Sequence, residues 1–295
     1  MRFGFLIAVS CLITLSLQAQ VEVGVIADDG QKRNFSSGEL IKIKNSKITF
    51  YVPEAYNTVF SEVLDEVWTI SDYELTSHAP GEMTTGKTSP LFYFDVKKGQ
   101  NAQVFDVRCK LGMKDYNGNN LVVASFPLYQ SAELNKVLTM QSETSALKPL
   151  IYSQPDFHNM SELSLKTNLQ AINNLLAMGK TQWMDEDVVK NAVMQNLQSE
   201  TLHIPTYCLL KPNFISGTEE NLDKEKLMKK YPYPWEICEP NGDGARFMLM
   251  VAQTGATVYI SIYDNLSGQF IYQTKNSNQF YLKKSNLKDI AKLIG

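Results

Sequence analysis

The chain has 295 residues, of which 44% are hydrophobic and 20% charged, and 28 basic against 31 acidic residues give a net charge of −3. This is ordinary globular composition, and the length allows one large or two modest domains. Nucleic-acid binding needs a concentrated basic surface, and the longest basic runs here are pairs such as Lys229-Lys230 and Lys283-Lys284. We therefore expect no nucleic-acid partner.

The first residues have the pattern of a secretory signal peptide. Arg2 precedes an uncharged apolar run over 3–17, and the small residue Ala19 follows it. The run is shorter than the roughly 20 apolar residues that a membrane-spanning helix prefers. We expect cleavage after Ala19, export to the periplasm or cell surface, and no transmembrane segment after cleavage. An uncleaved anchor is the alternative.

Apolar periodicity predicts a series of short elements in the N-terminal half. The pattern indicates strands over 41–53, 67–70, 91–96, 103–111 and 120–126, and helices over 58–67 and 132–138. The last two strands flank Asp115-Tyr116-Asn117-Gly118, and Asn-Gly favours a hairpin turn. The expected order is β-α-β-β-β-β-α.

The C-terminal half repeats this order. The pattern indicates strands over 202–210, 235–237, 246–252, 258–263 and 270–274, a helix over 223–230, and a terminal helix capped by Ser285 that ends at Ile294. Both halves contain a Trp-x-Ile segment, at Trp68 and at Trp235, and an Asp…Gly turn. We infer two similar α+β modules that arose by internal duplication.

Helices over 163–178, ended by Gly179, and over 185–197 are expected between the halves. The predicted organisation is a signal peptide at 1–19, an N-terminal module at 20–140, a helical linker at 141–200 and a C-terminal module at 201–295. Three methionines near the linker, Met178, Met184 and Met194, could be read as a cofactor site, but methionine is a common core filler. No cofactor is expected.

Residues 81–88, GEMTTGKT, match the P-loop pattern G-x-x-x-x-G-K-[ST], with Lys87 and Thr88 at its end. A working P-loop has a helix leaving from that end, so that amide groups face the phosphates. Here Ser89-Pro90 and an aromatic strand pattern follow at once, and an exported chain meets little ATP or GTP. We interpret the match as a coincidental loop, with a nucleotide hydrolase as an alternative.

Other catalytic or metal-binding motifs are absent from the sequence, and we predict no catalytic, cofactor-binding or metal-binding residues. His203 is expected to be a satisfied core histidine, on the opposite strand face from Cys208, and His158 a turn or cap residue. Cys109 is expected in the core, and Cys208 and Cys238 are either bridged or buried free thiols. A third histidine, His78, lies in loop sequence.

Carboxylate pairs leave no spacing signature, so an extracytoplasmic hydrolase stays open as an alternative function. Its candidates are Asp65, Glu66 and Glu74, for which a charged helix surface is the default expectation.

Four segments of the C-terminal half, about a third of the chain, carry a resemblance: SETLHIP (199–205), KKYPYPWEI (229–237), FMLMVA (247–252) and DNLSGQFIY (264–272). With them the chain resembles exported proteins of gram-negative bacteria that have no assigned activity. The resemblance implies export and an α+β module, and it supplies no site residues.

The function expected from these features is non-enzymatic binding or scaffolding in the periplasm or at the cell surface, with a protein or envelope component as partner. The segment 231–235 is read either as a contact site or as a helix stop packed on its own sheet.

Overall fold

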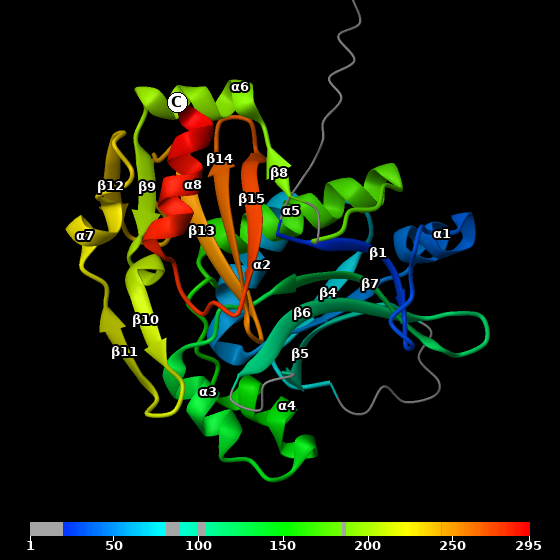
Figure 1. Cartoon of the computed structure of the whole chain (residues 1–295). Helices are drawn as coiled ribbons and strands as arrows, with labels where there is room; N and C mark the ends of the chain where they lie inside the picture. The colour runs from blue at the N-terminus through cyan, green and yellow to red at the C-terminus, as the bar shows by residue number, and fades with distance from the viewer. Residues whose placement is uncertain (1–19, 81–88, 100–103, 185–186, 243) are drawn as a thin grey trace, which may run out of the picture.

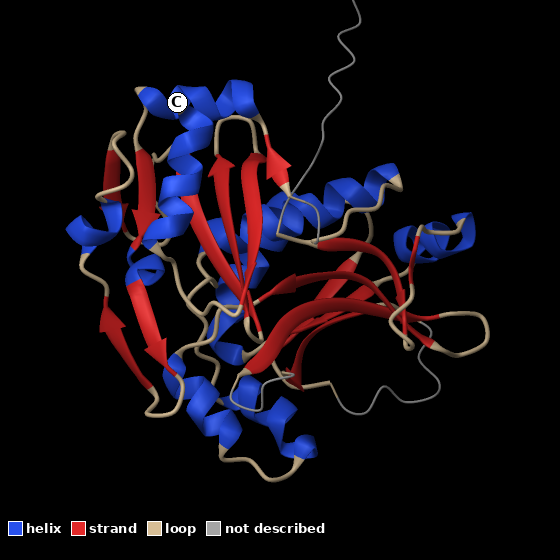
Figure 2. Ribbon diagram, viewed as in Figure 1, coloured by secondary structure: helices blue, strands red, loops and turns tan. Residues whose placement is uncertain are grey.

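A computed structural model of the chain describes residues 20–80, 89–99, 104–184, 187–242 and 244–295. The expected signal peptide (1–19) and the P-loop-like segment (81–88) lie outside these residues. The fold is α+β, as predicted, with two mixed sheets and helices around and between them (Figures 1 and 2). None of the helices in the described ranges has the length and apolar character needed to cross a membrane.

The N-terminal sheet has seven strands in the order β2-β1-β7-β6-β5-β3-β4. Strand β3 runs parallel to its neighbours β4 and β5, and all other pairs are antiparallel. The strands are β1 (Glu22–Ala27), β2 (Lys32–Arg33), β3 (Ile48–Tyr51), β4 (Tyr73–Thr76), β5 (Leu91–Lys98), β6 (Phe105–Lys114) and β7 (Asn120–Pro127).

The C-terminal sheet has six strands in the order β12-β9-β13-β14-β15-β8. Strand β9 runs parallel to β12 and β13, and the remaining pairs are antiparallel. The strands are β8 (Val188–Val189), β9 (Leu202–Pro205), β12 (Trp235–Cys238), β13 (Phe247–Thr254), β14 (Thr257–Asp264) and β15 (Gln269–Ser277). A separate hairpin pairs β10 (Leu210–Asn213) with β11 (Thr218–Asn221).

The two sheets have matching topology. Without β2, the N-terminal order β4-β3-β5-β6-β7-β1 corresponds strand for strand to β12-β9-β13-β14-β15-β8, with the same parallel and antiparallel pairs. Equivalent strands β6 and β14 each show a register shift near the following turn, at Leu111/Gly112 and at Ile262/Tyr263. Internal duplication remains our hypothesis for this likeness.

Each of these units also begins with elements outside the predicted β-α-β-β-β-β-α order. A strand and a helix precede it: β1 and α1 (Ser37–Asn45) in one unit, β8 and α6 (Asn191–Met194, within the predicted helix 185–197) in the other. Both strands pair with the last strand of their own sheet, β1 with β7 and β8 with β15; β8 is at a sheet edge, whereas β2 lies outside β1. The module boundaries given above stay a prediction.

Helix α5 (Glu162–Met178) lies between the two sheets and joins them into one core (Figure 1). It packs against α2 (Asn57–Val67), and its leucines share a cluster with strand residues of both sheets. All positions of β13 are buried, with Met248 and Met250 in this shared core. Phe247, Leu249 and Val251 alternate with them and pack on the opposite side, which α8 (Lys284–Ile294) covers.

The first described residues belong to this core. Gln20 is 1% exposed, and its side-chain amide donates a hydrogen bond to Ser261 Oγ of β14 at 2.8 Å. Val21 and Val23 are fully buried beside it. Residue 20 is therefore held by a strand 241 positions further along the chain.

Many local predictions are confirmed. Helices α2, α5, α3 (Ala132–Thr139) and α8 and the long strands of both sheets lie where periodicity placed them. The terminal helix also lies where predicted, but the prediction that Ser285 caps it is wrong: the helix begins at Lys284 with Lys283 as the N-cap, and Ser285 lies in its first turn. Helix α7 (Lys224–Met228) occupies the predicted 223–230 segment.

Four further local predictions are wrong. Residues 41–45 belong to α1, and residues 67–70 form no strand, so the Trp68 segment is not equivalent to β12. The strand predicted over 202–210 ends at Pro205, where the 3-10 turn η3 (Thr206–Leu209) begins. The described part of 185–197 is divided among β8, α6 and η2 (Gln195–Gln198), because β15 recruits Val188 and Val189 into its sheet. Helix α4 (Thr144–Ser153) was not predicted.

Helix α1 forms because its first turn is capped. Ser36 Oγ accepts a hydrogen bond from the Glu39 amide, and the Glu39 carboxylate accepts one from the Ser36 amide, which makes a reciprocal capping box. Arg33 donates to both carboxylate oxygens of Glu39, at 2.9 and 2.6 Å. This capping outweighs the alternating pattern of 41–45, which resembles a strand.

Glu39 is expected to contribute to acid stability. The Arg33 hydrogen bonds, followed by those from Ser36, lower the pKa of Glu39 to about 2, against roughly 4.3 for an unfolded glutamate. The contribution is therefore complete above about pH 4.3 and is lost as pH falls toward 2. Glu39→Gln should lower stability at neutral pH and flatten the stability curve between those pH values, measured by urea unfolding. Glu225→Gln on α7 is the control, and an unchanged curve for Glu39→Gln would contradict the assignment.

Candidate binding cleft

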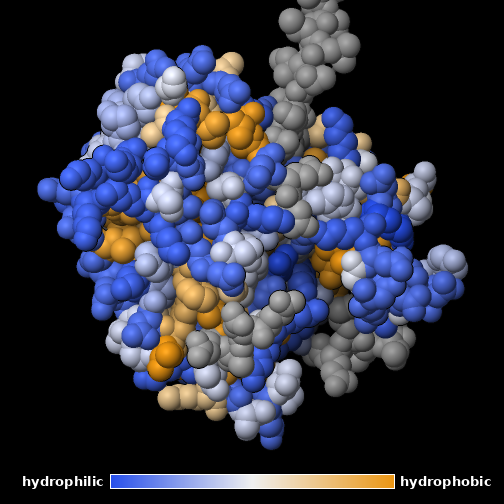
Figure 3. All heavy atoms as spheres, viewed as in Figure 1, coloured by the Kyte–Doolittle hydropathy of each residue, from blue (hydrophilic) through white to orange (hydrophobic). Residues whose placement is uncertain are grey.

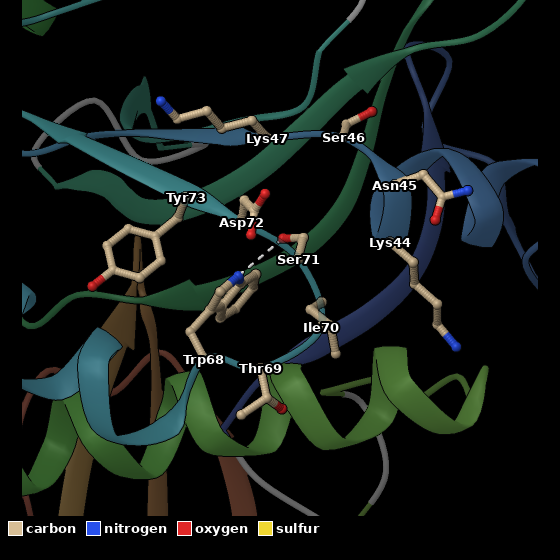
Figure 4. Close-up of a pocket in the computed structure, with 10 residues that line it drawn as sticks. All are labelled: Lys44, Asn45, Ser46, Lys47, Trp68, Thr69, Ile70, Ser71, Asp72 and Tyr73. Atoms are coloured by element: carbon tan, nitrogen blue, oxygen red, sulfur yellow. Dashed lines mark hydrogen bonds between the residues drawn. The ribbon is translucent and has the colours of Figure 1, made fainter.

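A large cleft lies at the amino-terminal ends of β3 and β4. Its volume is ≈ 860 Å³, and two connecting segments line it, 44–47 between α1 and β3 and 68–73 between α2 and β4 (Figure 4). The lining is mainly polar, with the side chains of Asn45, Ser46, Thr69, Ser71 and Asp72 around the opening. Such a surface can recognise a ligand through several hydrogen bonds.

The backbone of the second segment is held by Asn173 of α5. The Asn173 Oδ1 atom accepts hydrogen bonds from the amides of Thr69 at 2.8 Å and Ile70 at 3.2 Å, and Nδ2 donates to Thr69 Oγ1 at 3.1 Å. Asn173 is 3% exposed, so these bonds form away from competing water. The wall of the cleft is therefore fixed before a ligand arrives.

The aromatic residues of the cleft support it from below. Trp68 is 6% exposed, and its indole nitrogen donates to Ser71 Oγ at 3.2 Å (Figure 4). Its ring meets Phe50 edge-on at a centroid distance of 5.2 Å, and Tyr73 meets Phe50 edge-on at 5.9 Å. Trp68 is consequently a buried support and offers no open ring face for stacking.

The two lysines of the cleft are already engaged. Lys47 Nζ lies 2.8 Å from Glu74 Oε2, and Lys44 Nζ donates to the Ala177 carbonyl at the end of α5 at 2.8 Å. Asn45 and Asp72 have exposed side chains. The arrangement favours a hydrophilic ligand bound by hydrogen bonds, and it provides no concentrated positive charge for an anion.

The three carboxylates considered for hydrolysis have separate partners. Asp65 accepts a hydrogen bond from the Tyr73 hydroxyl, Glu66 pairs with Lys166, and Glu74 pairs with Lys47. Each is thus part of a different local ion pair or hydrogen bond, and none of these contacts joins two of the three carboxylates.

The histidines lie in three different settings. His78 is exposed and lies 2.8 Å from Thr76 Oγ1. His158 lies in a turn, as predicted, and its Nε2 atom is 2.8 Å from Glu219 of β11. Burial opposes ionisation of Glu219, but the hydrogen bond and charge of His158 outweigh it and lower the Glu219 pKa. This pair joins the turn before α5 to β11.

His203 differs from the prediction. It lies in β9, as expected, but its side chain is 21% exposed at a second cleft, and its buried Nδ1 atom has no hydrogen-bond partner among the residues that the structure describes. The expectation of a satisfied core histidine is therefore wrong. Cys208 lies in η3, where the alternation of strand faces does not apply.

All three cysteines in the described ranges are free thiols, so Cys208 and Cys238 are not bridged. Cys109 is fully buried in the core, as predicted, and burial raises its pKa well above the usual value.

Met184 and Met194 are buried and Met178 is 43% exposed, so packing accounts for the first two. Among the described residues, no group of three or more His, Cys, Asp or Glu side chains is placed to hold a metal.

The segment 231–235 acts as a helix stop packed on its own sheet. Tyr231 is 2% exposed and meets Tyr233 edge-on at 5.6 Å, and both pack against the core on the α8 side.

Downstream of the P-loop-like segment, Ser89-Pro90 lead directly into β5 at Leu91, as predicted. The coincidental-loop interpretation of 81–88 itself stays a prediction.

No protein-family model, curated protein sequence or solved structure matches this chain. The cleft residues were not identified from the sequence, because they lie in two connections whose proximity depends on the parallel pairing of β3 with β4. The available signal was weak: each of the two segments follows a helix and precedes a strand, and such segments meet at one sheet edge when the strands are parallel neighbours.

Proposed function

We propose that this chain is an exported, non-enzymatic binding protein that recognises a hydrophilic component of the cell envelope through the cleft between α1–β3 and α2–β4. The observation that carries the proposal is the preformed polar wall of this cleft, in which Asn173 holds the backbone of Thr69 and Ile70. A wall ordered in advance reduces the entropy that a ligand must lose on binding.

Two further features support this proposal. Lys47 is paired with Glu74 and Lys44 donates to a backbone carbonyl, so recognition would depend mainly on hydrogen bonds from groups such as Asn45 and Asp72. On the face shown in Figure 3, hydrophilic residues predominate and hydrophobic residues form separate areas. Export rests on the signal-peptide pattern of residues 1–19 and on the resemblance noted for the C-terminal half.

The test is retention of the purified chain on separated envelope fractions: peptidoglycan, lipopolysaccharide and soluble envelope protein. We expect one fraction to retain the wild-type chain, and Asn45→Ala/Asp72→Ala to weaken retention by about tenfold, which corresponds to roughly 1.4 kcal/mol of lost hydrogen bonding. Sequencing of the chain from the envelope should begin at Gln20.

The matched control is Asn196→Ala/Asp156→Ala, the same pair of changes at residues that do not line the cleft. Equal retention of both double variants and the wild type would reject the cleft as the binding surface. Recovery of the chain from the cytoplasm with residues 1–19 attached would reject export.

A further inference from the structure

A second cleft lies in the C-terminal half, on the face of the sheet where β12, β9 and β13 are neighbours. Its volume is ≈ 320 Å³, and it is lined by His203, Glu236, Cys238, Glu239, Asn241 and Gly242. Since side chains two positions apart in a strand share a face, Glu236 and Cys238 of β12 point to the same side. His203 pairs with Glu236 on one side and with Met248 of β13 on the other.

Two sulfur atoms meet at this cleft. Cys238 Sγ lies 3.7 Å from Met248 Sδ, although β9 separates their strands, so the long Met248 side chain crosses over β9 to reach the cysteine. Two sulfurs that each lie ~2.3 Å from one metal ion are about 3.8 Å apart when the angle at the metal is near 110°. The observed separation therefore already suits shared coordination.

Met248 is held in this position by the loop above it. Gly242 is buried with φ +51°, and a Cβ atom there would lie 1.9 Å from the Met248 Cε atom. The Gly242 amide donates to the Glu239 carbonyl, and its carbonyl accepts from the Ala245 amide. A side chain at position 242 would displace the Met248 thioether.

His203 supplies a nitrogen donor on the strand that Met248 crosses. Its Nε2 atom is 3.9 Å from Glu236, whereas its Nδ1 atom is buried without a hydrogen-bond partner among the described residues. An S–H···S contact between Cys238 and Met248 explains why the two sulfur atoms lie together. It does not explain why the ring nitrogen of His203 is buried without a partner, although such burial costs stability.

The equivalent position of the N-terminal sheet has a purely apolar pair. Phe50 pairs with Phe92 between β3 and β5, as His203 pairs with Met248 between β9 and β13. The phenyl rings stack at 4.8 Å within the core. Equivalent positions thus hold two core phenyl rings in the N-terminal sheet, and an imidazole and a thioether in the C-terminal sheet.

We propose that Cys238, Met248 and His203 form a binding site for Cu(I). Thiolate and thioether sulfur together with imidazole are ligands that favour this ion. On binding, Cu(I) replaces the thiol proton of Cys238, the proton passes to solvent, and the copper stays Cu(I), so the charge of the site does not change. Glu236 and Glu239 at the opening of the cleft attract a cation.

The test is an anaerobic titration of the reduced full-length chain with Cu(I), in competition with a chromophoric Cu(I) chelator. We expect one strongly bound Cu(I) per chain and a thiolate-to-copper absorption band in the ultraviolet.

Cys238→Ser, Met248→Leu and His203→Gln should each weaken binding by about 100-fold or more, since even the loss of outer partners of a metal site costs 10–100-fold. Met248→Leu preserves side-chain volume, so this variant remains informative if the others unfold. The control is Met113→Leu, at a methionine that is 2% exposed in β6. X-ray absorption of the bound copper should show two sulfur neighbours and one nitrogen neighbour.

Several outcomes would overturn the proposal. The first is that the wild type fails to withdraw Cu(I) from the chelator. The second is that Cys238→Ser or Met248→Leu binds Cu(I) as tightly as the wild type. The third is an X-ray absorption spectrum of the copper that shows no nitrogen neighbour. A Cu(I) affinity that Met113→Leu lowers as much as Met248→Leu would show a general loss of packing instead. The envelope-retention experiment is independent of these results.

Discussion

Phe50→Ala is expected to lower the free energy of unfolding by about 3–5 kcal/mol, the usual cost of removing a phenyl ring from a packed core. Phe50 is fully buried in β3, and it contacts the rings of Phe92, Trp68 and Tyr73 at centroid distances of 4.8, 5.2 and 5.9 Å. Urea unfolding should show a lower midpoint with an unchanged slope. The variant should also lose envelope retention, because the cleft wall rests on this ring.

Tyr116→Ala is the control for this prediction. Tyr116 is 96% exposed at the tip of the β6–β7 hairpin, so its removal should change stability by less than about 0.5 kcal/mol. A loss below about 1 kcal/mol for Phe50→Ala would mean that the aromatic cluster is not packed as described.

Gly24→Ala is expected to destabilise the protein by about 3 kcal/mol, through overpacking and backbone strain together. A Cβ atom at Gly24 would lie 2.3 Å from the Cη2 atom of Trp183, and the residue has φ +151°. Trp183 follows Gln182, whose backbone pairs with Val23 at 2.8 and 2.7 Å. The backbone of this segment is therefore fixed to β1, and the clash can be relieved only by turning the Trp183 ring out of its position. Thermal and urea unfolding measure the loss.

A double-variant cycle separates the two contributions. In a Trp183→Ala background the clash is absent, and Gly24→Ala should cost only the backbone part, about 1 kcal/mol. Gly38→Ala in α1 is the matched control, since nothing lies within 4 Å of its added Cβ, and it should stabilise the helix by up to about 1 kcal/mol. Equal costs of Gly24→Ala in both backgrounds would exclude the contact with Trp183 as the cause.

The sequence predicts the long elements well, because their burial follows their own periodicity. Helix α5 shows a helical repeat that ends at Gly179, which has φ +65°, and β13 is a run of apolar residues buried on both faces. Elements fixed by distant partners were missed. Strand β8 has two residues and exists because β15 pairs with it. Residues 41–45 were missed for a local reason, since they alternate like a strand but follow a capping box.

Strand order is a further limit on prediction from sequence. The first strand of each unit joins the sheet beside the last one, a long-range pairing that no local pattern indicates. Both candidate sites depend on such neighbours. The polar cleft needs β3 beside β4, and the donors His203, Cys238 and Met248 lie on three strands whose order in the sheet differs from their order in the chain. A search by residue spacing finds neither site.

The bond between Gln20 and Ser261 has a consequence for how the polypeptide matures. Gln20 leaves the ribosome before Ser261 has been synthesised. The N-terminal segment therefore stays unpaired until β14 has been made. During that interval its valines can associate with other chains or with a chaperone. The native state thus forms only after the last strands have been made. In a truncated translation product that lacks β14, the N-terminal segment has no strand to pack against.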